Sequence, residues 1–94
     1  MDKSEAIEVL EKELETLRPI PYLDLKKNIE KEPITKEVTS SSGKKYYIEI
    51  ITHWDDKPGG DIRVHGCVDD GGLRAFSPLS SDFIKSSNNE FIDE

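Results

Sequence analysis

Residues 44–77 constrain the fold of this chain most, because they read as three strands joined by two glycine-rich turns. Apolar and polar side chains alternate along the strand segments, which is typical of strands with one buried face. The first turn, residues 55–61, and the second, Asp70-Gly71, have the aspartate and glycine content that tight turns favour. This stretch therefore predicts an antiparallel meander.

A further strand is expected just before this stretch, at residues 34–39. A three-residue loop, residues 41–43, lets Gly43 adopt the left-handed conformation that such hairpins require. This loop places Val38 opposite Tyr46. The sheet is thus expected to contain three or four strands.

The turns also predict which face of the sheet is buried. Trp54 is expected opposite Ile62, and a two-residue type I′ turn at Asp70-Gly71 sets Val68 opposite Leu73 in a strand at residues 73–77. Even-numbered residues of the two longer strands then face the core, and they are Tyr46, Ile48, Ile50, Thr52, Trp54, Ile62, Val64, Gly66 and Val68.

Helical periodicity precedes the sheet. Apolar residues spaced 3, 4 and 3 apart predict an amphipathic helix that begins after Asp2, ends near Pro19 and packs on the sheet. A second short helix is expected at residues 22–31, with Pro21 in its first turn. The buried positions of the two helices are Ile7, Leu10, Leu14 and Leu17 in the first, and Tyr22, Leu25 and Ile29 in the second.

The chain length suits one domain with a small core, since the chain has 94 residues. We expect a helical part at residues 3–32, a sheet part at 34–77 and a short C-terminal extension at 78–94. In the extension, two apolar pairs, Phe83-Ile84 and Phe91-Ile92, either form a small hairpin or stay loose.

The charge and cysteine content narrow the function. The net charge is −7, from 20 acidic and 13 basic residues, which disfavours binding to a phosphate backbone and favours a basic protein partner. A single cysteine excludes an intrachain disulfide and suits the cytoplasm. No apolar run approaches the length of a membrane span, so we expect no membrane association.

The face of the sheet opposite the core carries the candidate functional residues. Two histidines, a cysteine, two arginines and two aromatic residues are more than a solvated sheet face requires. In the expected register Arg74 lies opposite Cys67, and Phe76 lies opposite His65. The candidate binding residues are Tyr47, Ile51, His53, Arg63, His65, Cys67, Arg74 and Phe76.

Three interpretations of this face remain open. In the simplest, Glu49, Arg63 and Arg74 form cross-strand ion pairs and the termini cover the rest. In the other two, the cluster of His53, His65 and Cys67 binds a metal ion or supplies a nucleophilic thiol. The spacing matches no known zinc motif, and reactive thiols favour helix starts over the middle of a strand.

The aspartates of the two turns are not expected to act together. The turns lie at opposite ends of a meander, about 20 Å apart for strands of this length. Neither turn has the alternating oxygen ligands of a calcium loop. Turn formation accounts for these residues.

The C-terminal half resembles a known group of proteins. The segments GGDIRV, from residue 59, and DDGGLRAFSPL, from residue 69, are similar to an uncharacterised family of small bacterial α+β domains of unknown function. The resemblance implies a stand-alone bacterial domain and carries no activity with it.

These observations predict an α+β domain with one or two N-terminal helices on one face of a three- to four-stranded antiparallel meander. We expect a small acidic, non-enzymatic protein–protein interaction module, of which inhibitors and immunity-type proteins are examples, without metal or cofactor. It is expected to be a monomer or a homodimer. The alternative is a metal-binding or cysteine-dependent small enzyme that uses His53, His65 and Cys67.

Overall fold

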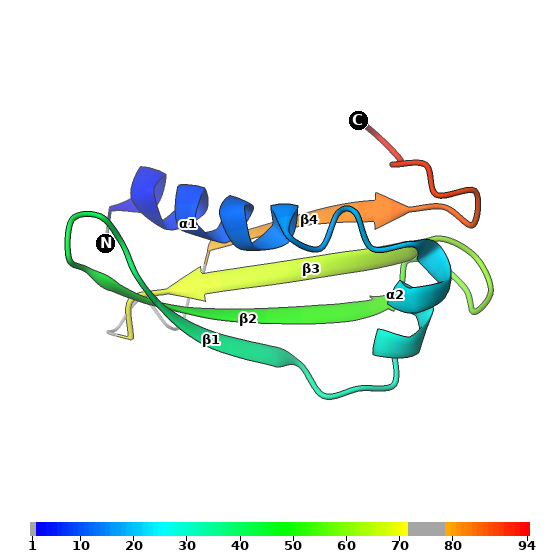
Figure 1. Ribbon diagram of the computed structural model, residues 1–94, viewed down its shortest axis with the longest axis horizontal. Helices are drawn as coiled ribbons and strands as arrows, with labels where there is room; N and C mark the ends of the chain where they lie inside the picture. Colours follow the sequence, from blue (N-terminus) through cyan, green and yellow to red (C-terminus); the bar gives the residue numbers. More distant parts are fainter. Residues whose placement is uncertain (1, 72–78) are drawn as a thin grey trace.

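Two helices precede a four-stranded antiparallel sheet in the computed structural model, which describes residues 2–71 and 79–94 (Figure 1). The strands lie side by side in chain order, β1-β2-β3-β4. The expected α+β class is confirmed. The elements are α1 (Lys3–Glu15), α2 (Tyr22–Asn28), β1 (Ile34–Thr39), β2 (Lys45–Trp54), β3 (Ile62–Asp69) and β4 (Leu79–Lys85).

The register of the first three strands is the one predicted from the turns. Val38 lies opposite Tyr46, and Trp54 lies opposite Ile62. Gly43 has a φ of 88°, in the left-handed region, as the three-residue loop requires. The even-numbered side chains of β2 and β3 therefore form the inner face of the sheet, and most of them are fully buried.

The partner of β3 differs from the prediction. Val68 lies opposite Leu79 of β4, not opposite Leu73, which falls outside the described residues. Gly71 has a positive φ, but Asp70 does not, so the expected type I′ turn does not form at these two residues. The stretch 78–94, expected to be an extension, therefore contains β4, an edge strand of the sheet with one face toward the core.

The pairing with β4 has a clear physical reason. Phe83 of β4 is only 2% exposed, so this strand contributes a large aromatic side chain to the core. The difference from the expected pairing is six residues, an even number, so the same face of β3 stays buried. On β4 the odd-numbered residues point inward and the even-numbered ones point outward.

Helix α1 packs on the inner face over β3 and β4, while β1 forms the far edge of the sheet (Figure 1). Leu10 and Leu14 are buried against β3, where Gly66 leaves room for them. Of the expected stripe, Ile7 is only half-buried and Val9 is buried in its place.

The N-terminus of α1 is tied to the β1–β2 hairpin. The Asp2 carboxylate accepts a hydrogen bond from the Glu5 N–H at 3.0 Å, as an N-cap should. Glu5 Oε1 in turn accepts a hydrogen bond from the hydroxyl of buried Tyr46 at 2.8 Å. Ser40 and Ser42 also donate to this oxygen, at 2.9 Å each.

Helix α2 is shorter than expected, ending at Asn28, and Pro21 is its N-cap residue. Tyr22 and Leu25 are buried, and Ile29 packs against the core as predicted. The Tyr22 hydroxyl donates to the Gly60 carbonyl at 2.7 Å, which joins α2 to the β2–β3 turn.

The segment between the helices is held by a buried cation. Lys85, at the end of β4, is 4% exposed, and its ammonium donates hydrogen bonds to the carbonyls of Arg18 and Ile20. The chain then folds back so that Phe91 bridges to Lys85 and its ring meets Phe83 edge-on at 5.8 Å. The expected pairing of the two C-terminal apolar segments thus takes the form of this short bridge.

Candidate functional site

The outer face of the sheet is the surface opposite the helices. It is formed by the odd-numbered residues of β1, β2 and β3 and the even-numbered residues of β4. Directly opposite neighbours across β2 and β3 are Tyr47 and Asp69, Glu49 and Cys67, Ile51 and His65, and His53 and Arg63. The ladder therefore brings six of the eight predicted residues onto one surface. The other two, Arg74 and Phe76, lie outside the described residues.

A chain of polar contacts crosses this face beside β4. Arg63 Nε lies 2.8 Å from Asp55 Oδ1, and its Nη1 lies 2.6 Å from Asp82 Oδ2. The same Asp82 oxygen is 3.4 Å from His65 Nδ1, and His65 Nε2 is 3.6 Å from Cys67 Sγ. The expected ion pairing of Arg63 thus occurs with two aspartates and not with Glu49.

Asp82 and Asp55 are the residues of this network that the sequence prediction did not place on the outer face. Asp82 lies directly opposite His65 because β4 pairs with β3. Residues 79–85, LSSDFIK, give only a weak strand signal, because three polar residues in a row and the Phe83-Ile84 pair break the alternation. The glycine-rich turn before them suggested a nearer partner strand.

The thiol of Cys67 is not activated by its neighbours. Burial raises the pKa of this thiol, and the negative charges of Glu49 and Asp69 raise it further. His65 is within contact distance of the sulfur, so the thiol has a base beside it. The surroundings nevertheless favour the neutral thiol, whereas a nucleophilic cysteine needs the thiolate.

The metal interpretation finds no ligand set in the part of the chain that the structure describes. No group of three or more histidine, cysteine, aspartate or glutamate side chains there is arranged to hold a metal ion. The Nδ1 atom of His53 lies 2.9 Å from the carbonyl oxygen of its neighbour Trp54, so one of the two ring nitrogens is engaged with the backbone.

A shallow groove runs across the outer face from β1 to β3. Its volume is about 490 Å³, and its polar lining is predominantly acidic. Tyr47 and Ile51 project beside it with 43% and 38% of their surface exposed. The lining residues are Thr35, Lys36, Glu37, Tyr47, Ile48, Glu49, Cys67 and Asp69.

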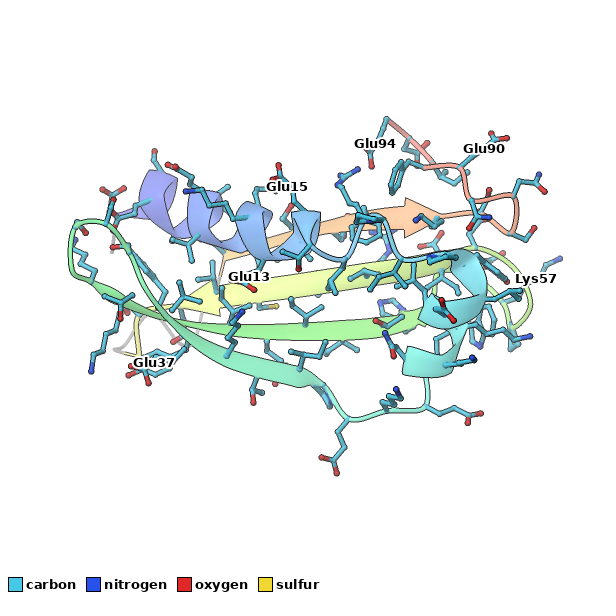
Figure 2. All side chains as sticks on the ribbon, in the orientation of Figure 1. Glu13, Glu15, Glu37, Lys57, Glu90 and Glu94 are labelled. Carbon is cyan, nitrogen blue, oxygen red and sulfur yellow. The ribbon has the colours of Figure 1, made fainter. Side chains whose placement is uncertain are left out.

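The acidic groups of the groove are only partly neutralised. Glu37 Oε1 lies 3.6 Å from the ammonium of Lys45. Glu49 and Asp69 have no cationic partner among residues 2–71 and 79–94. Figure 2 shows Glu37 pointing away from α1, toward the open side of β1. The groove therefore presents negative charge next to two exposed apolar side chains.

No family model, curated protein or solved structure matches this chain. The similarity to a family of small bacterial domains stays a prediction. Within the described residues, no helix is long and apolar enough to cross a membrane. The interpretation of the outer face rests on its own geometry.

Proposed function

We propose that this protein is a non-enzymatic interaction module that binds a basic surface of a partner protein on the outer face of its sheet. The observation that carries the proposal is the acidic groove flanked by exposed Tyr47 and Ile51. An inhibitor or immunity-type protein uses a surface of this kind to occupy a basic site on its target.

The electrostatics of the face support a cationic partner. Two positive groups of the face are already paired in the part of the chain that the structure describes, Arg63 with two aspartates and Lys45 with Glu37. Glu49 and Asp69 have no cationic partner in that part, and they add negative charge to a molecule of net charge −7. Such a field accelerates association with a basic partner and repels acidic ones.

The apolar side chains supply the contact area that charge alone lacks. Tyrosine is enriched among residues that dominate binding energy, because its ring buries a large area while its hydroxyl keeps a hydrogen bond. The Tyr47 ring lies against Gly71, where an added Cβ would be 2.7 Å from the ring, so one side of the ring contacts the protein and 43% of the residue stays exposed for a partner.

Affinity capture with matched charge variants tests this proposal. The wild type, Glu49→Lys and Glu15→Lys are immobilised, and the captured proteins are compared at low and high salt. Both variants replace a glutamate by a lysine, so they change the net charge equally. Glu15 is exposed on α1 and points away from the sheet (Figure 2), so its replacement leaves the outer face unaltered. We expect a salt-sensitive basic partner that binds wild type and Glu15→Lys but not Glu49→Lys. Equal capture by both variants would refute the outer face as the binding site.

A second candidate function is thiol chemistry at Cys67. The contacts from Asp82 to His65 and from His65 to Cys67 favour it, because they have the order of orienting carboxylate, base and nucleophile. The raised pKa of the thiol opposes it. The rate of alkylation of Cys67 by iodoacetamide decides between the two, since a nucleophilic cysteine reacts faster than a free thiol at neutral pH.

A further inference from the structure

Strand β1 is an edge of the sheet that no other described strand covers. It has β2 on one side, and five of its six residues are exposed. The Ser40 N–H donates to the Lys44 carbonyl at 2.8 Å, so Ser40 and Lys44 are a hydrogen-bonded pair. This pair determines which residues of β1 direct their backbone groups toward β2. Because hydrogen-bonded and non-hydrogen-bonded pairs alternate, the backbone groups of Thr35, Glu37 and Thr39 are expected to point away from β2. These residues offer unpaired donors and acceptors along the edge.

Two hollows border this edge on the inner side of the sheet. Helix α1 packs mainly over β3 and β4, and although Glu13 reaches Lys36 of β1, a groove remains between the helix and this strand. This groove has a volume of about 230 Å³ and lies between Val9 of α1 and Val38 of β1. A second hollow of about 250 Å³ adjoins Ile34 at the other end of the strand. Both hollows meet the inner-face positions of a strand added to β1.

We propose that β1 accepts an extended segment of the partner protein as a fifth, antiparallel strand, with apolar side chains on the inner face and basic side chains on the outer face. This inference rests on the proposed function, because the basic side chains of the added strand reach the acidic groove. It adds to that function the conformation and the sequence pattern of the partner.

The side-chain pattern follows from the neighbours on each face. On the inner face, Ile34, which is 45% exposed, and Val38 are the apolar side chains of β1 that border the two hollows, so apolar partner residues opposite them would pack against these two side chains. The rest of the lining is largely polar or charged and includes Glu5, Glu8, Lys12 and Glu13 in the first hollow and Lys31 and Glu32 in the second. Lys36 also points inward, but its ammonium is 3.0 Å from the Glu13 carboxylate. Its charge is therefore satisfied and does not repel an incoming strand, as an unpaired inward lysine on an edge would.

On the outer face, charge complementarity selects lysine or arginine. Thr35 lies directly opposite Glu49, and its short side chain leaves Glu49 accessible from the edge. Strands are spaced about 4.8 Å apart, so a partner residue opposite Thr35 has its Cα about 10 Å from that of Glu49. Extended lysine and glutamate side chains together span this distance. Glu37 offers a second carboxylate two residues along the same edge.

A second copy of this chain fits the edge poorly. Two registers of a twofold antiparallel pair align five residues of β1 with five of its copy. One of these places Lys36 opposite Lys36, whose ammonium groups are already paired with Glu13, and the other places Glu37 opposite Glu37. Like charges directly opposite disfavour the Glu37 register, and in both registers two molecules that each carry a net charge of −7 would have to approach.

Two N-methylated peptides provide the test. Both alternate valine and lysine, match β1 in length (6 residues) and are capped at the ends. In the proposed pairing the lysines lie opposite Thr35, Glu37 and Thr39, so the lysine N–H groups face β1 and the valine N–H groups face solvent. Methylation of the valine nitrogens leaves the pairing edge intact and prevents self-association. Methylation of the lysine nitrogens removes the donors that pair with β1.

Binding is measured by calorimetry and by amide chemical shifts of the labelled protein. We expect the valine-methylated peptide to bind and to shift the amides of β1, with the lysine-methylated peptide at least about tenfold weaker. Thr35→Pro removes an outward N–H at an edge position that tolerates proline, and it should also weaken binding at least about tenfold. Thr35→Val keeps the backbone N–H and is the matched control, so it should bind the peptide at least about tenfold more tightly than Thr35→Pro does. Circular dichroism and thermal unfolding establish that both variants are folded.

The outcomes separate this inference from the proposed function. Equal binding of the two peptides, no binding of either, or full binding by Thr35→Pro overturns the added strand. A free protein that is dimeric, and that Thr35→Pro converts to a monomer, assigns the edge to a second copy and also overturns it. If the peptides do not bind but the partner is still lost with Glu49→Lys, the proposed function stands alone. If Thr35→Pro weakens peptide binding but Glu49→Gln binds the peptide as the wild type does, the added strand is supported and binding through the acidic outer face is refuted.

Discussion

Replacement of Gly66 by alanine tests the packing of α1 on the sheet. A Cβ at this position would lie 2.7 Å from Leu10 Cδ1 and 3.4 Å from Leu14 Cδ2. Carbon atoms in contact are normally about 3.5–4.0 Å apart, so Leu10 would have to retreat by about 1 Å. Leu10 is 0% exposed and has no free space to enter.

The expected change in stability combines two opposing effects. Overpacking of a filled core costs about 1–3 kcal/mol. Alanine restricts the unfolded chain more than glycine does, which returns about 0.5–1 kcal/mol. The middle of these two ranges gives a net loss in the free energy of unfolding of about 1 kcal/mol. For a domain of this size that loss lowers the Tm by about 4–8 °C.

Urea unfolding, followed by the fluorescence of Trp54 and by circular dichroism, measures this loss. A double-mutant cycle with Leu10→Ala supplies the control. Leu10→Ala alone should cost about 2–5 kcal/mol, but in its presence Gly66→Ala should cost nothing or stabilise, because the added methyl fills part of the cavity. The reasoning is refuted if Gly66→Ala leaves the urea midpoint unchanged, or if the two substitutions are additive.

Three further predictions concern titratable groups. Burial, together with the hydrogen bond to Glu5, raises the pKa of Tyr46 to about 12. Since this pKa exceeds the value of about 10 for tyrosine in an unfolded chain, the stability that Tyr46 contributes should be fully present below about pH 10 and be lost as the pH rises toward 12. Absorbance at 295 nm should show a tyrosine ionisation near pH 12 that is absent in Tyr46→Phe. Cys67 should react with iodoacetamide more slowly than free cysteine at neutral pH because its thiol pKa is raised, and Glu49→Gln should speed the reaction by removing one of the causes; a rate above that of free cysteine would contradict this. Lys85→Met should lower the free energy of unfolding by about 1–3 kcal/mol, because two backbone carbonyls lose a charged donor while the apolar part of the side chain is retained; an unchanged urea midpoint would show that water replaces the ammonium.

The candidate site was predictable only as far as the register of β2 and β3. Ile51, His65 and Cys67 were assigned to the outer face from alternation and turn length alone, and the structure places them there. Asp82 was not predicted, because its contact with His65 depends on the pairing of two strands separated by more than a turn. The role assigned to Arg74 and Phe76 followed from the pairing that proved wrong.

The sequence by itself determined the local geometry and the buried face. Alternation along β2 and β3, the left-handed conformation of Gly43 and the spacing of Leu10 and Leu14 are properties of short segments, so they can be read without knowledge of the rest of the chain. Even the shift of six residues at β4 kept the inner face unchanged, because side chains alternate with a period of two.

Only the tertiary structure decided which segment completes the sheet. The local turn signal at Asp70-Gly71 favoured a close hairpin, but burial of Phe83 beneath α1 and of Lys85 beneath the interhelical segment is gained only when β4 pairs with β3. Lys85 and Ile20, for example, are 65 positions apart in the sequence, so a short segment cannot predict such a contact. The open edge at β1 has the same origin, since α1 leaves that edge uncovered by packing over β3 and β4.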